Sequence, residues 1–261
     1  MYYQKLKDNL FAKVQYPDEL KETMHGAVAW REFCRLPQET KEHFAFPDHQ
    51  EIWDPGYKMR ERAKGREDKE YFHITSKNNE FLDYYKLNDE VHQSKELENF
   101  FAFAENVWKQ ASALVLEIGK DLDKDIPGLA AQLEKGRDKQ LLRLLHYIPK
   151  EDDDISLADQ HFDRSGFTLH LYESHNGLQY LDFDMVWKDA PIKDGETIVF
   201  NGYQMEVITN EKIKKTWHRV VRNKQYKEGE TRISMVLFVP FVDTPTYPAE
   251  ARSQDMIAGY K

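Results

Sequence analysis

Apolar residues recur at helical spacing through the first half of the chain. The longest run spans 96–122, where one broad apolar stripe is expected to pack lengthwise on a core. Similar spacing over 18–36 and 37–44 predicts two further helices, and Pro37 suits the first turn of the second. A shorter helix is expected after Pro127. The pattern therefore predicts a mainly helical first half.

The pattern changes to β character in the second half. The apolar run 141–147 is compatible with a buried strand. Beyond residue 160, short strand-like segments are separated by turn residues. These predicted strands span 166–172, 178–183, 197–200, 204–209, 218–222 and 232–239. Strands at this spacing indicate a sandwich or a barrel.

The order of these elements, helices first and an antiparallel β core second, predicts one compact α+β domain over 1–261. We expect a mainly helical cap and support over 1–135, a β core over 136–242 and a carboxy-terminal tail over 243–261. Within the helical part, the stretch 46–65 contains proline and glycine and predicts a loop.

Net charge and cysteine content limit the expected binding partners and the expected cellular compartment. The 46 acidic against 37 basic residues leave a formal charge of -9, which disfavours binding to nucleic acid or to an anionic membrane. Cys34 is the only cysteine, so no internal disulfide can form, as is usual in a reducing cytosol. No apolar run approaches the length of a secretory signal or a membrane span. We therefore expect a cytoplasmic protein, and a monomer by default.

A candidate metal-binding pair lies at the start of the predicted strand that follows residue 160. His161 and Asp163 are two positions apart, so a strand would point both side chains to one face. His218 is the candidate third ligand. Two imidazoles and one carboxylate on one face of an octahedral ion leave three positions open, the arrangement used for iron(II) oxygen chemistry. Zinc, copper or nickel could take the same ligands.

The His-x-acid spacing alone is a weak signal, because His49 and Glu51 have it too. A second pair of residues strengthens the evidence for a functional site. Strand alternation puts Arg232 and Ser234 on one face, where a guanidinium and a hydroxyl can receive a carboxylate. The alternative interpretation is a surface arginine and serine on a half-exposed strand.

The chain resembles the isopenicillin N synthase-like branch of the iron(II)- and 2-oxoglutarate-dependent oxygenases. The resemblance covers most of the chain, and the motifs follow that family's order. They are 161–169 (HFDRSGFTL), 177–179 (GLQ), 209–210 (TN), 218–221 (HRVV), 232–234 (RIS) and 238–240 (FVP). Upstream, 142–147 (LRLLHY) resembles the strand that carries a cosubstrate-binding tyrosine, and 33–41, 56–57 and 68–72 resemble the family's helical cap.

The resemblance implies a double-stranded β-helix, or jelly roll, with an amino-terminal helical cap and a long packing helix. It implies that Fe(II) is held by His161, Asp163 and His218. It also implies that Arg232, Ser234 and, with an inserted residue nearby, Tyr147 bind 2-oxoglutarate. O2 would be the second cosubstrate, and a C–H bond of a small organic molecule would be hydroxylated with release of succinate and CO2. Because the amino-terminal segment is shorter than in plant relatives, we expect the opening strand to be missing.

Two other functions stay open at this point. One is an iron oxidase of the same fold that uses no 2-oxoglutarate, in which Arg232 and Ser234 bind the substrate's own carboxylate. The other is a non-catalytic jelly-roll protein that binds a small acid. The sequence does not name the substrate, although Arg143 and Arg219 could each reach a substrate carboxylate or form a structural ion pair.

Several further features receive the plainer interpretation. His146, His170 and His175 are expected to be structural or surface residues. The acidic run 151–154 is interpreted as a solvated loop rather than a calcium site or docking surface. The tail 243–261 could fold over the barrel mouth as a lid, although no residue in it establishes this.

Overall fold

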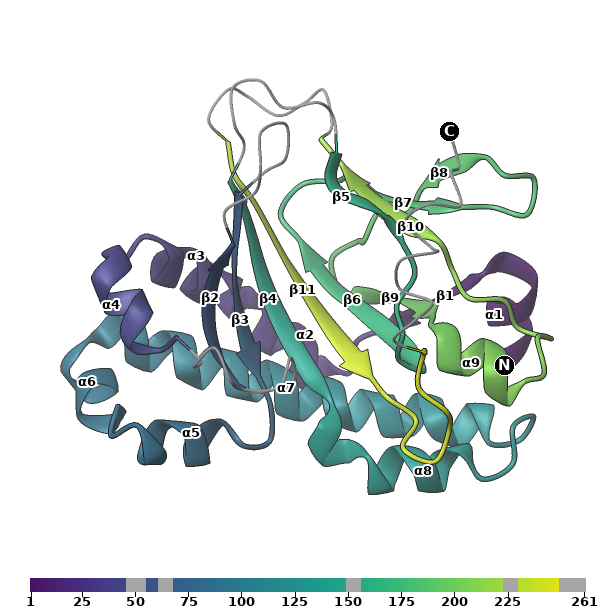
Figure 1. Ribbon diagram of the computed structural model, residues 1–261, viewed down its shortest axis with the longest axis horizontal. Coiled ribbons are helices and arrows are strands. Elements are labelled where there is room, and N and C mark those ends of the chain that lie inside the picture. Colours follow the sequence, from purple (N-terminus) through teal and green to yellow (C-terminus); the bar gives the residue numbers. More distant parts are fainter. Residues whose placement is uncertain (46–54, 61–67, 149–155, 223–229, 249–261) are drawn as a thin grey trace.

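The computed structural model describes residues 1–45, 55–60, 68–148, 156–222 and 230–248. In this part of the chain, two antiparallel sheets form a jelly roll, and helices cover the outer face of the larger sheet (Figure 1). The expected fold class, an α+β protein with a mainly β core, is confirmed.

The larger sheet has seven strands in the order β1-β9-β6-β11-β4-β3-β2. Their bounds are β1 Phe11–Gln15, β2 Gly56–Arg60, β3 Asp68–Ile74, β4 Leu141–Ile148, β6 Phe167–Glu173, β9 Glu196–Asn201 and β11 Arg232–Val239. The smaller sheet has the order β5-β10-β7-β8. Its strands are β5 Ser156–His161, β7 Leu178–Leu181, β8 Trp187–Asp189 and β10 His218–Val221.

The long helix α7, Lys95–Leu122, supports the larger sheet (Figure 1). Ser94 caps it, since its Oγ accepts a hydrogen bond from the Leu97 backbone N–H at 3.3 Å. The predicted apolar stripe is buried, and each fully buried large side chain in it stabilises the fold by roughly 1.5–3 kcal/mol. The long packing helix is confirmed to within one residue of its predicted start.

Shorter helices surround α7 on the same side of the sheet. They are α1 Tyr2–Asn9, α2 Asp18–Met24, α3 Val28–Cys34, α4 Gln38–His43, α5 Asn78–Tyr84, α6 Asn88–Gln93 and α8 Leu129–Lys135, with 3-10 turns at His25–Ala27 and Arg137–Lys139. The predicted helix 18–36 is divided by the first of these turns. Gly26 lies there, and a Cβ on it would come within 2.9 Å of Phe103 Cδ2 on α7. Close packing on α7 therefore requires glycine at this position.

Strand alternation divides the apolar residues into two cores. On β4, Leu142 and Leu144 face the helices, whereas Leu145 and Tyr147 face the interior between the sheets. On β11, Met235 and its alternate neighbours likewise face the helices. The residues at 232, 234, 236 and 238 therefore face the interior, where they meet the smaller sheet.

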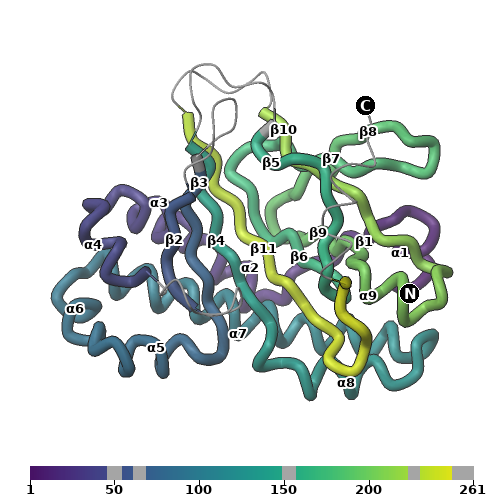
Figure 2. Tube along the Cα trace, viewed as in Figure 1, coloured from purple at the N-terminus to yellow at the C-terminus, as the bar shows by residue number. Residues whose placement is uncertain are grey.

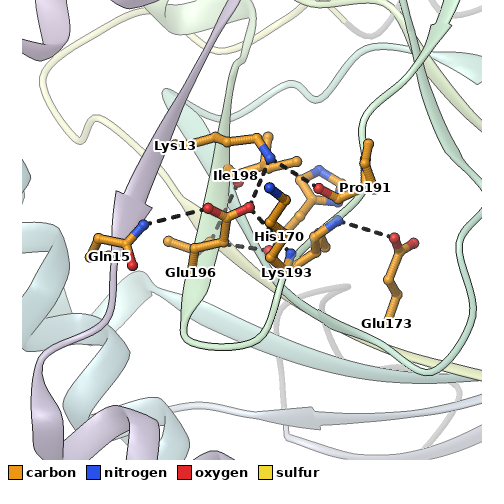
Figure 3. Close-up of polar contacts among 10 residues, drawn as sticks. Lys13, Gln15, His170, Glu173, Pro191, Lys193, Glu196 and Ile198 are labelled. Carbon is orange, nitrogen blue, oxygen red and sulfur yellow. Dashed lines mark hydrogen bonds and ion pairs between the residues drawn. The ribbon is translucent and has the colours of Figure 1, made fainter.

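Several predicted elements are wrong. The opening strand is present as β1, which pairs with β9; Figure 2 traces this amino-terminal segment beside β9. Lys13 on β1 also donates to Glu196 Oε1 at 2.8 Å and to the Pro191 carbonyl at 3.2 Å (Figure 3). The amino-terminal part is mainly helical as expected, but β1, β2 and β3 extend the β core into it.

Local pattern misled the prediction at three further places. Residues 56–60, expected in a loop, and 68–72, expected in the helical cap, form the paired strands β2 and β3. Residues 204–209, expected as a strand, lie mostly in helix α9, Tyr203–Ile208. The strands β5 and β8 were not predicted as such. These short segments take their conformation from strand partners and loops distant in the sequence.

No helix among the described residues is long and apolar enough to cross a membrane.

Candidate functional site

A cavity of about 80 Å³ lies between the two sheets and is lined by residues of both. Its polar and charged lining residues include every residue predicted from the sequence to bind metal or cosubstrate. The polar and charged lining residues are Lys69, Arg143, Tyr147, His161, Asp163, Thr168, His170, Tyr172, His218, Arg232 and Ser234. The sequence-predicted site residues are thus brought together in one place.

The three candidate metal ligands lie on two paired strands of the smaller sheet and on the loop that follows one of them. His161 ends β5, and its register partner His218 begins β10. The sequence had suggested that Asp163 lies inside a strand. In the structure it lies two residues past the end of β5. The Nε2 atoms of His161 and His218 lie 4.0 and 3.8 Å from the two carboxylate oxygens of Asp163, and the candidate ligand atoms all lie within 4.8 Å of one another.

Hydrogen bonds fix which nitrogen of each imidazole is available. His161 Nδ1 lies 2.7 Å from the Asp159 carbonyl oxygen, and His218 Nδ1 lies 3.1 Å from the Thr216 carbonyl oxygen. A carbonyl can only accept, so each Nδ1 carries the proton and donates it. In the neutral form of each ring the lone pair is then on Nε2, the atom that lies near the Asp163 carboxylate. Metal-bound histidines typically have their other ring nitrogen held in this way.

The electrostatics of the triad suit a cation. Burial favours a raised pKa for the Asp163 carboxyl, but the nearby His218, His161 and His170 shift the balance, and the pKa is lowered. Desolvation, followed by the neighbouring His218, lowers the pKa of His161 to about 4, although 47% of its side chain is exposed. Burial likewise lowers the pKa of His170 to about 3. At neutral pH the site therefore holds His161 and His170 as neutral imidazoles near the ionised carboxylate of Asp163.

Asp163 Oδ2 gives a direct indication that a ligand is needed. This oxygen is buried and has no hydrogen-bond partner among the described residues. A buried carboxylate oxygen without a partner is costly. Two imidazole lone pairs and this carboxylate form the two-histidine, one-carboxylate donor set that iron(II) oxygenases use. The donor set therefore fits iron(II), although other divalent metals fit it too.

The loop that carries Asp163 is held by the helix that the sequence did not predict. The first N–H groups of α9, at Tyr203 and Gln204, donate to the carbonyl oxygens of Asp163 and Ser165 at 2.8 and 3.1 Å. A Cβ at Gly202 would lie 2.0 Å from the Ser165 carbonyl oxygen, so only glycine permits this approach. The start of α9 thus places Asp163 opposite the two histidines.

The predicted carboxylate receptor lies on the inner face of the larger sheet. Arg232 and Ser234 share that face of β11, and Tyr147 is the register partner of Arg232 on β4. All three residues are buried, with 3%, 5% and 4% of their surfaces exposed. The guanidinium carbon of Arg232 lies 5.5 Å from the centre of the Tyr147 ring. The expected arrangement is therefore observed.

Sequence reasoning missed the partner of Arg232. Its Nη2 donates to Glu173 Oε2 at 2.6 Å, and its Nε donates to the His175 carbonyl at 3.1 Å. Glu173 Oε1 in turn accepts a hydrogen bond from the Ile192 backbone N–H at 3.3 Å. Arg232 Nη1 is buried and has no partner in the described part of the chain. The guanidinium is thus held on two sides, with one nitrogen left for a ligand.

The remaining candidates divide between the cavity and other locations. His170 lines the cavity, contrary to the expectation of a structural or surface role, whereas His146 bonds Glu70 outside it. Arg143 also lines the cavity. Arg219 is not among the lining residues; its guanidinium carbon lies 4.3 Å from the centre of the Trp187 ring.

Three features singled out in the sequence lie outside the described residues. They are the second His-x-acid pair at 49–51, the acidic run 151–154 and the part of the tail from 249 onward.

Comparisons with known proteins agree with this geometry. A sequence model of the 2OG-Fe(II) oxygenase superfamily matches residues 139–240, which contain all six predicted site residues. The Arabidopsis thaliana 1-aminocyclopropane-1-carboxylate oxidase homolog 10 is 32% identical over 151 residues, covering 55% of this chain and 40% of the relative. The chain thus spans less than two thirds of the length of the curated relatives it matches.

Solved structures share the fold over nearly the whole chain. A Shewanella oneidensis protein described as a candidate oxygenase has a TM-score of 0.71 at 22% identity, covering 98% of this chain and 92% of that one. A full-length Neurospora crassa protein, solved in complex with alpha-KG, has a TM-score of 0.70 at 20% identity, covering 91% of this chain and 77% of that one. The match of residues 139–240 to the 2OG-Fe(II) oxygenase superfamily model and the shared fold thus agree with each other.

Proposed function

We propose that this protein is an iron(II)- and 2-oxoglutarate-dependent dioxygenase that hydroxylates a C–H bond of a small organic substrate. The observation that carries the proposal is the geometry of the triad. Two histidines present Nε2 lone pairs, fixed by their Nδ1 hydrogen bonds, to a carboxylate with an unpartnered buried oxygen. The match of residues 139–240 to the 2OG-Fe(II) oxygenase superfamily model supports the same conclusion.

His161 Nε2, His218 Nε2 and the Asp163 carboxylate would hold the metal. Iron(II) bound with 2-oxoglutarate and O2 supplies an oxidant strong enough to hydroxylate a C–H bond, with release of succinate and CO2. The protein's contribution is to fix three ligands on one side of the ion and leave the opposite side open to the cavity. The intact carboxylate at Asp163 favours hydroxylation over halogenation.

Arg232, Ser234 and Tyr147 would bind the far carboxylate of 2-oxoglutarate. Arg232 Nη1 is the buried nitrogen without a partner among the described residues, and Ser234 lies two residues along the same face of β11. The Neurospora crassa structural neighbour was solved in complex with alpha-KG, which supports this assignment. Charge-assisted hydrogen bonds from a guanidinium are strong, so this contact would orient the cosubstrate toward the triad.

Apolar side chains complete the cavity and limit its exchange with solvent. Leu145, Leu178, Val220 and Val236 are buried with at most 7% exposure and line the same space as the triad. Exclusion of water strengthens the polar contacts within the site and protects reactive species from side reactions.

One observation favours a second candidate, an iron oxidase that uses no 2-oxoglutarate. Glu173 already neutralises Arg232 at 2.6 Å, so the receptor has little net positive charge for a cosubstrate carboxylate. In that enzyme, Arg232 and Ser234 would contact the substrate itself.

An anaerobic titration of the apoprotein with iron(II) and then 2-oxoglutarate tests the proposal. The visible metal-to-ligand charge-transfer band should form in the wild type and weaken in His218→Ala and in Arg232→Ala. Arg219→Ala, which alters an arginine outside the cavity, should leave the band unchanged. Tight iron binding without a band would support the second candidate, and absence of iron binding would support a non-catalytic binding protein.

The remaining expectations are part of the same proposal. A small-molecule substrate accords with the family and with the size of the cavity. A cytoplasmic monomer that binds neither nucleic acid nor membranes accords with the net charge of -9 and the single cysteine.

A further inference from the structure

A second arginine lines the cavity at a different level from Arg232. Arg143 lies on the inner face of β4, and its register partner on β11 is Val236, which in turn pairs with His170 on β6. Arg143 and His170 are therefore two strand spacings apart, roughly 10 Å. The His170 ring lies 5.3 Å from that of His218. Arg143 thus faces the cavity at the level of the metal triad.

Contacts hold the Arg143 side chain in place without neutralising it. Its Nε donates to His73 Nε2 at 2.8 Å. Its guanidinium carbon lies 5.2 Å from the centre of the Tyr71 ring and 4.9 Å from that of Phe238. No carboxylate among the described residues pairs with it, whereas Arg232 is paired with Glu173. The guanidinium is oriented between two rings, and its terminal nitrogens have no hydrogen bond in the described part of the chain.

The Arg143 side chain is partly buried where it lines the cavity. Burial lowers the pKa of Arg143, which reflects how poorly its surroundings solvate the charge. An arginine nevertheless stays protonated, because its pKa in water is far above neutrality. The charge of Asp163 partly offsets this effect, and a partly desolvated cation is stabilised further by a ligand that supplies an opposite charge in direct contact. The side chain is therefore held in a state that an anionic ligand would stabilise.

We propose that Arg143 receives a carboxylate of the primary substrate, so that the protein oxidises small organic acids. This inference rests on the proposed oxygenase function and assigns the substrate class of the same cavity. The planar guanidinium, held by His73 at Nε, presents the fork geometry that binds a carboxylate through two hydrogen bonds. With the carboxylate anchored there, a carbon several bonds away reaches the triad.

The cosubstrate and the substrate would then use separate receptors. Arg232 and Val236, the register partner of Arg143, are four residues apart on β11, which corresponds to roughly 13 Å. The two arginines are therefore attached at separate points of the cavity wall. Glu173 compensates the charge of Arg232, whereas no carboxylate among the described residues forms an ion pair with Arg143, so the two receptors differ in net charge.

Propionate and its uncharged analogue propionamide provide the test. The protein is loaded with zinc(II), which does not support turnover, and with saturating 2-oxoglutarate, which occupies Arg232. Dissociation constants are then measured by ligand-observed NMR at constant ionic strength. Wild-type protein should bind propionate at least tenfold more tightly than propionamide.

Substitutions of Arg143, with Arg219 as the control, test whether Arg143 binds the carboxylate. Arg143→Gln should weaken propionate binding at least tenfold. Arg143→Lys keeps the positive charge but not the forked guanidinium, so its propionate affinity should lie between those of the wild type and Arg143→Gln. The matched control Arg219→Gln should change it less than twofold. Equal binding of propionate and propionamide by the wild type, no binding of either, or unchanged propionate binding by a folded Arg143→Gln protein would overturn the proposal.

Failure of the proposed oxygenase function gives a different result. The charge-transfer band with iron(II) and 2-oxoglutarate depends on His218 and Arg232 and should persist in Arg143→Gln. If the band is absent in the wild type but propionate binding still depends on Arg143, then the oxygenase assignment fails and the carboxylate receptor stands. If the band is present and propionate binding does not depend on Arg143, the reverse holds.

Discussion

Two clusters of the molecule look alike by residue type, and each has a buried carboxylate at its centre. Asp163 with His161 and His218 forms one, and Glu70 with His146 and Cys34 forms the other; in each, the potential ligand atoms lie within 4.8 Å of one another. The first lies in the cavity between the sheets. The second lies on the opposite face of β3 and β4, where Glu70 and His146 are register partners.

The clusters differ in whether their polar atoms already have partners. Glu70 accepts hydrogen bonds from Lys41 Nζ at 2.5 Å, Tyr57 Oη at 2.7 Å and His146 Nδ1 at 2.7 Å. Burial favours a raised pKa for Glu70, but these three hydrogen bonds together lower it to about 2. Burial also raises the pKa of the Cys34 thiol, which disfavours the thiolate that a metal requires.

The comparison shows that proximity alone does not define a metal site. The Glu70 cluster contains its own cation, Lys41, and connects the helices α3 and α4 to the outer face of the sheet. Among the described residues Asp163 is paired with His161 and His218 and with no lysine or arginine, and its buried Oδ2 has no hydrogen-bond partner there. We therefore assign the Glu70 cluster to stability and the Asp163 cluster to metal binding.

The largest expected effect follows from removal of a histidine from each cluster. His218→Ala should weaken iron(II) binding by at least about 100-fold, since loss of a supporting partner alone costs 10–100-fold. His146→Ala, the matched change in the other cluster, should leave iron affinity within about threefold. Anaerobic calorimetric titration measures both. Similar losses in the two variants would contradict the division of roles.

Removal of the cation from the second cluster should affect stability alone. Lys41→Met leaves Glu70 buried without its counter-ion and should lower the free energy of unfolding by about 3–5 kcal/mol. Lys120→Met breaks an exposed pair with Glu117 and should cost less than about 1 kcal/mol. Urea denaturation measures both. A weakened iron affinity in Lys41→Met would show that the clusters are coupled.

The pH dependence of stability offers another test of the Glu70 cluster. The pKa of Glu70 is about 2 in the folded protein, below the value near 4.3 expected when unfolded. Its stabilising effect should therefore be complete above about pH 5 and should disappear as the pH falls toward 2. The difference in unfolding free energy between wild type and Glu70→Gln should shrink over this range. A constant difference would contradict the ionised state assigned to Glu70.

The sequence predicts best those features that depend on local spacing. The apolar stripe of α7 and the shared face of Arg232 and Ser234 both follow from the geometry of one element. The triad was identified because the order of several motifs supported the His161 and Asp163 pair. Its local geometry was nevertheless assigned wrongly, because Asp163 is held by α9, which was predicted as a strand.

Features that depend on pairing between distant strands were not predictable in this way. Glu173 meets Arg232 because β6 lies beside β11, and no local pattern marks that pair. The strand β3 was assigned to the helical cap, and Tyr71 on it packs against Arg143 only because β3 pairs with β4. The sequence had left Arg143 and Arg219 equivalent. Only the strand register distinguishes the arginine in the cavity from the one outside it.

Glu173→Gln tests how the counter-ion affects the cosubstrate receptor. Glutamine keeps a hydrogen-bond acceptor for Arg232 but removes a negative charge beside the position proposed for a carboxylate. We expect 2-oxoglutarate to bind about 3–10-fold more tightly, since like charges at this range oppose each other by about 1 kcal/mol or more. Titration of the charge-transfer band measures this. Weaker binding would mean that Glu173 acts mainly by orienting Arg232.

The smallest effect is expected at Tyr147, the least direct of the proposed cosubstrate contacts. Tyr147→Phe keeps the ring that packs 5.5 Å from the Arg232 guanidinium carbon and removes only the hydroxyl. Loss of one hydrogen bond should weaken 2-oxoglutarate binding about 2–10-fold, with iron affinity unchanged. Tyr172 on β6 also lines the cavity but is not a proposed cosubstrate contact. Tyr172→Phe therefore serves as the matched control in the same titration. Equal effects of the two substitutions would remove Tyr147 from the receptor and leave Arg232 and Ser234 as its members.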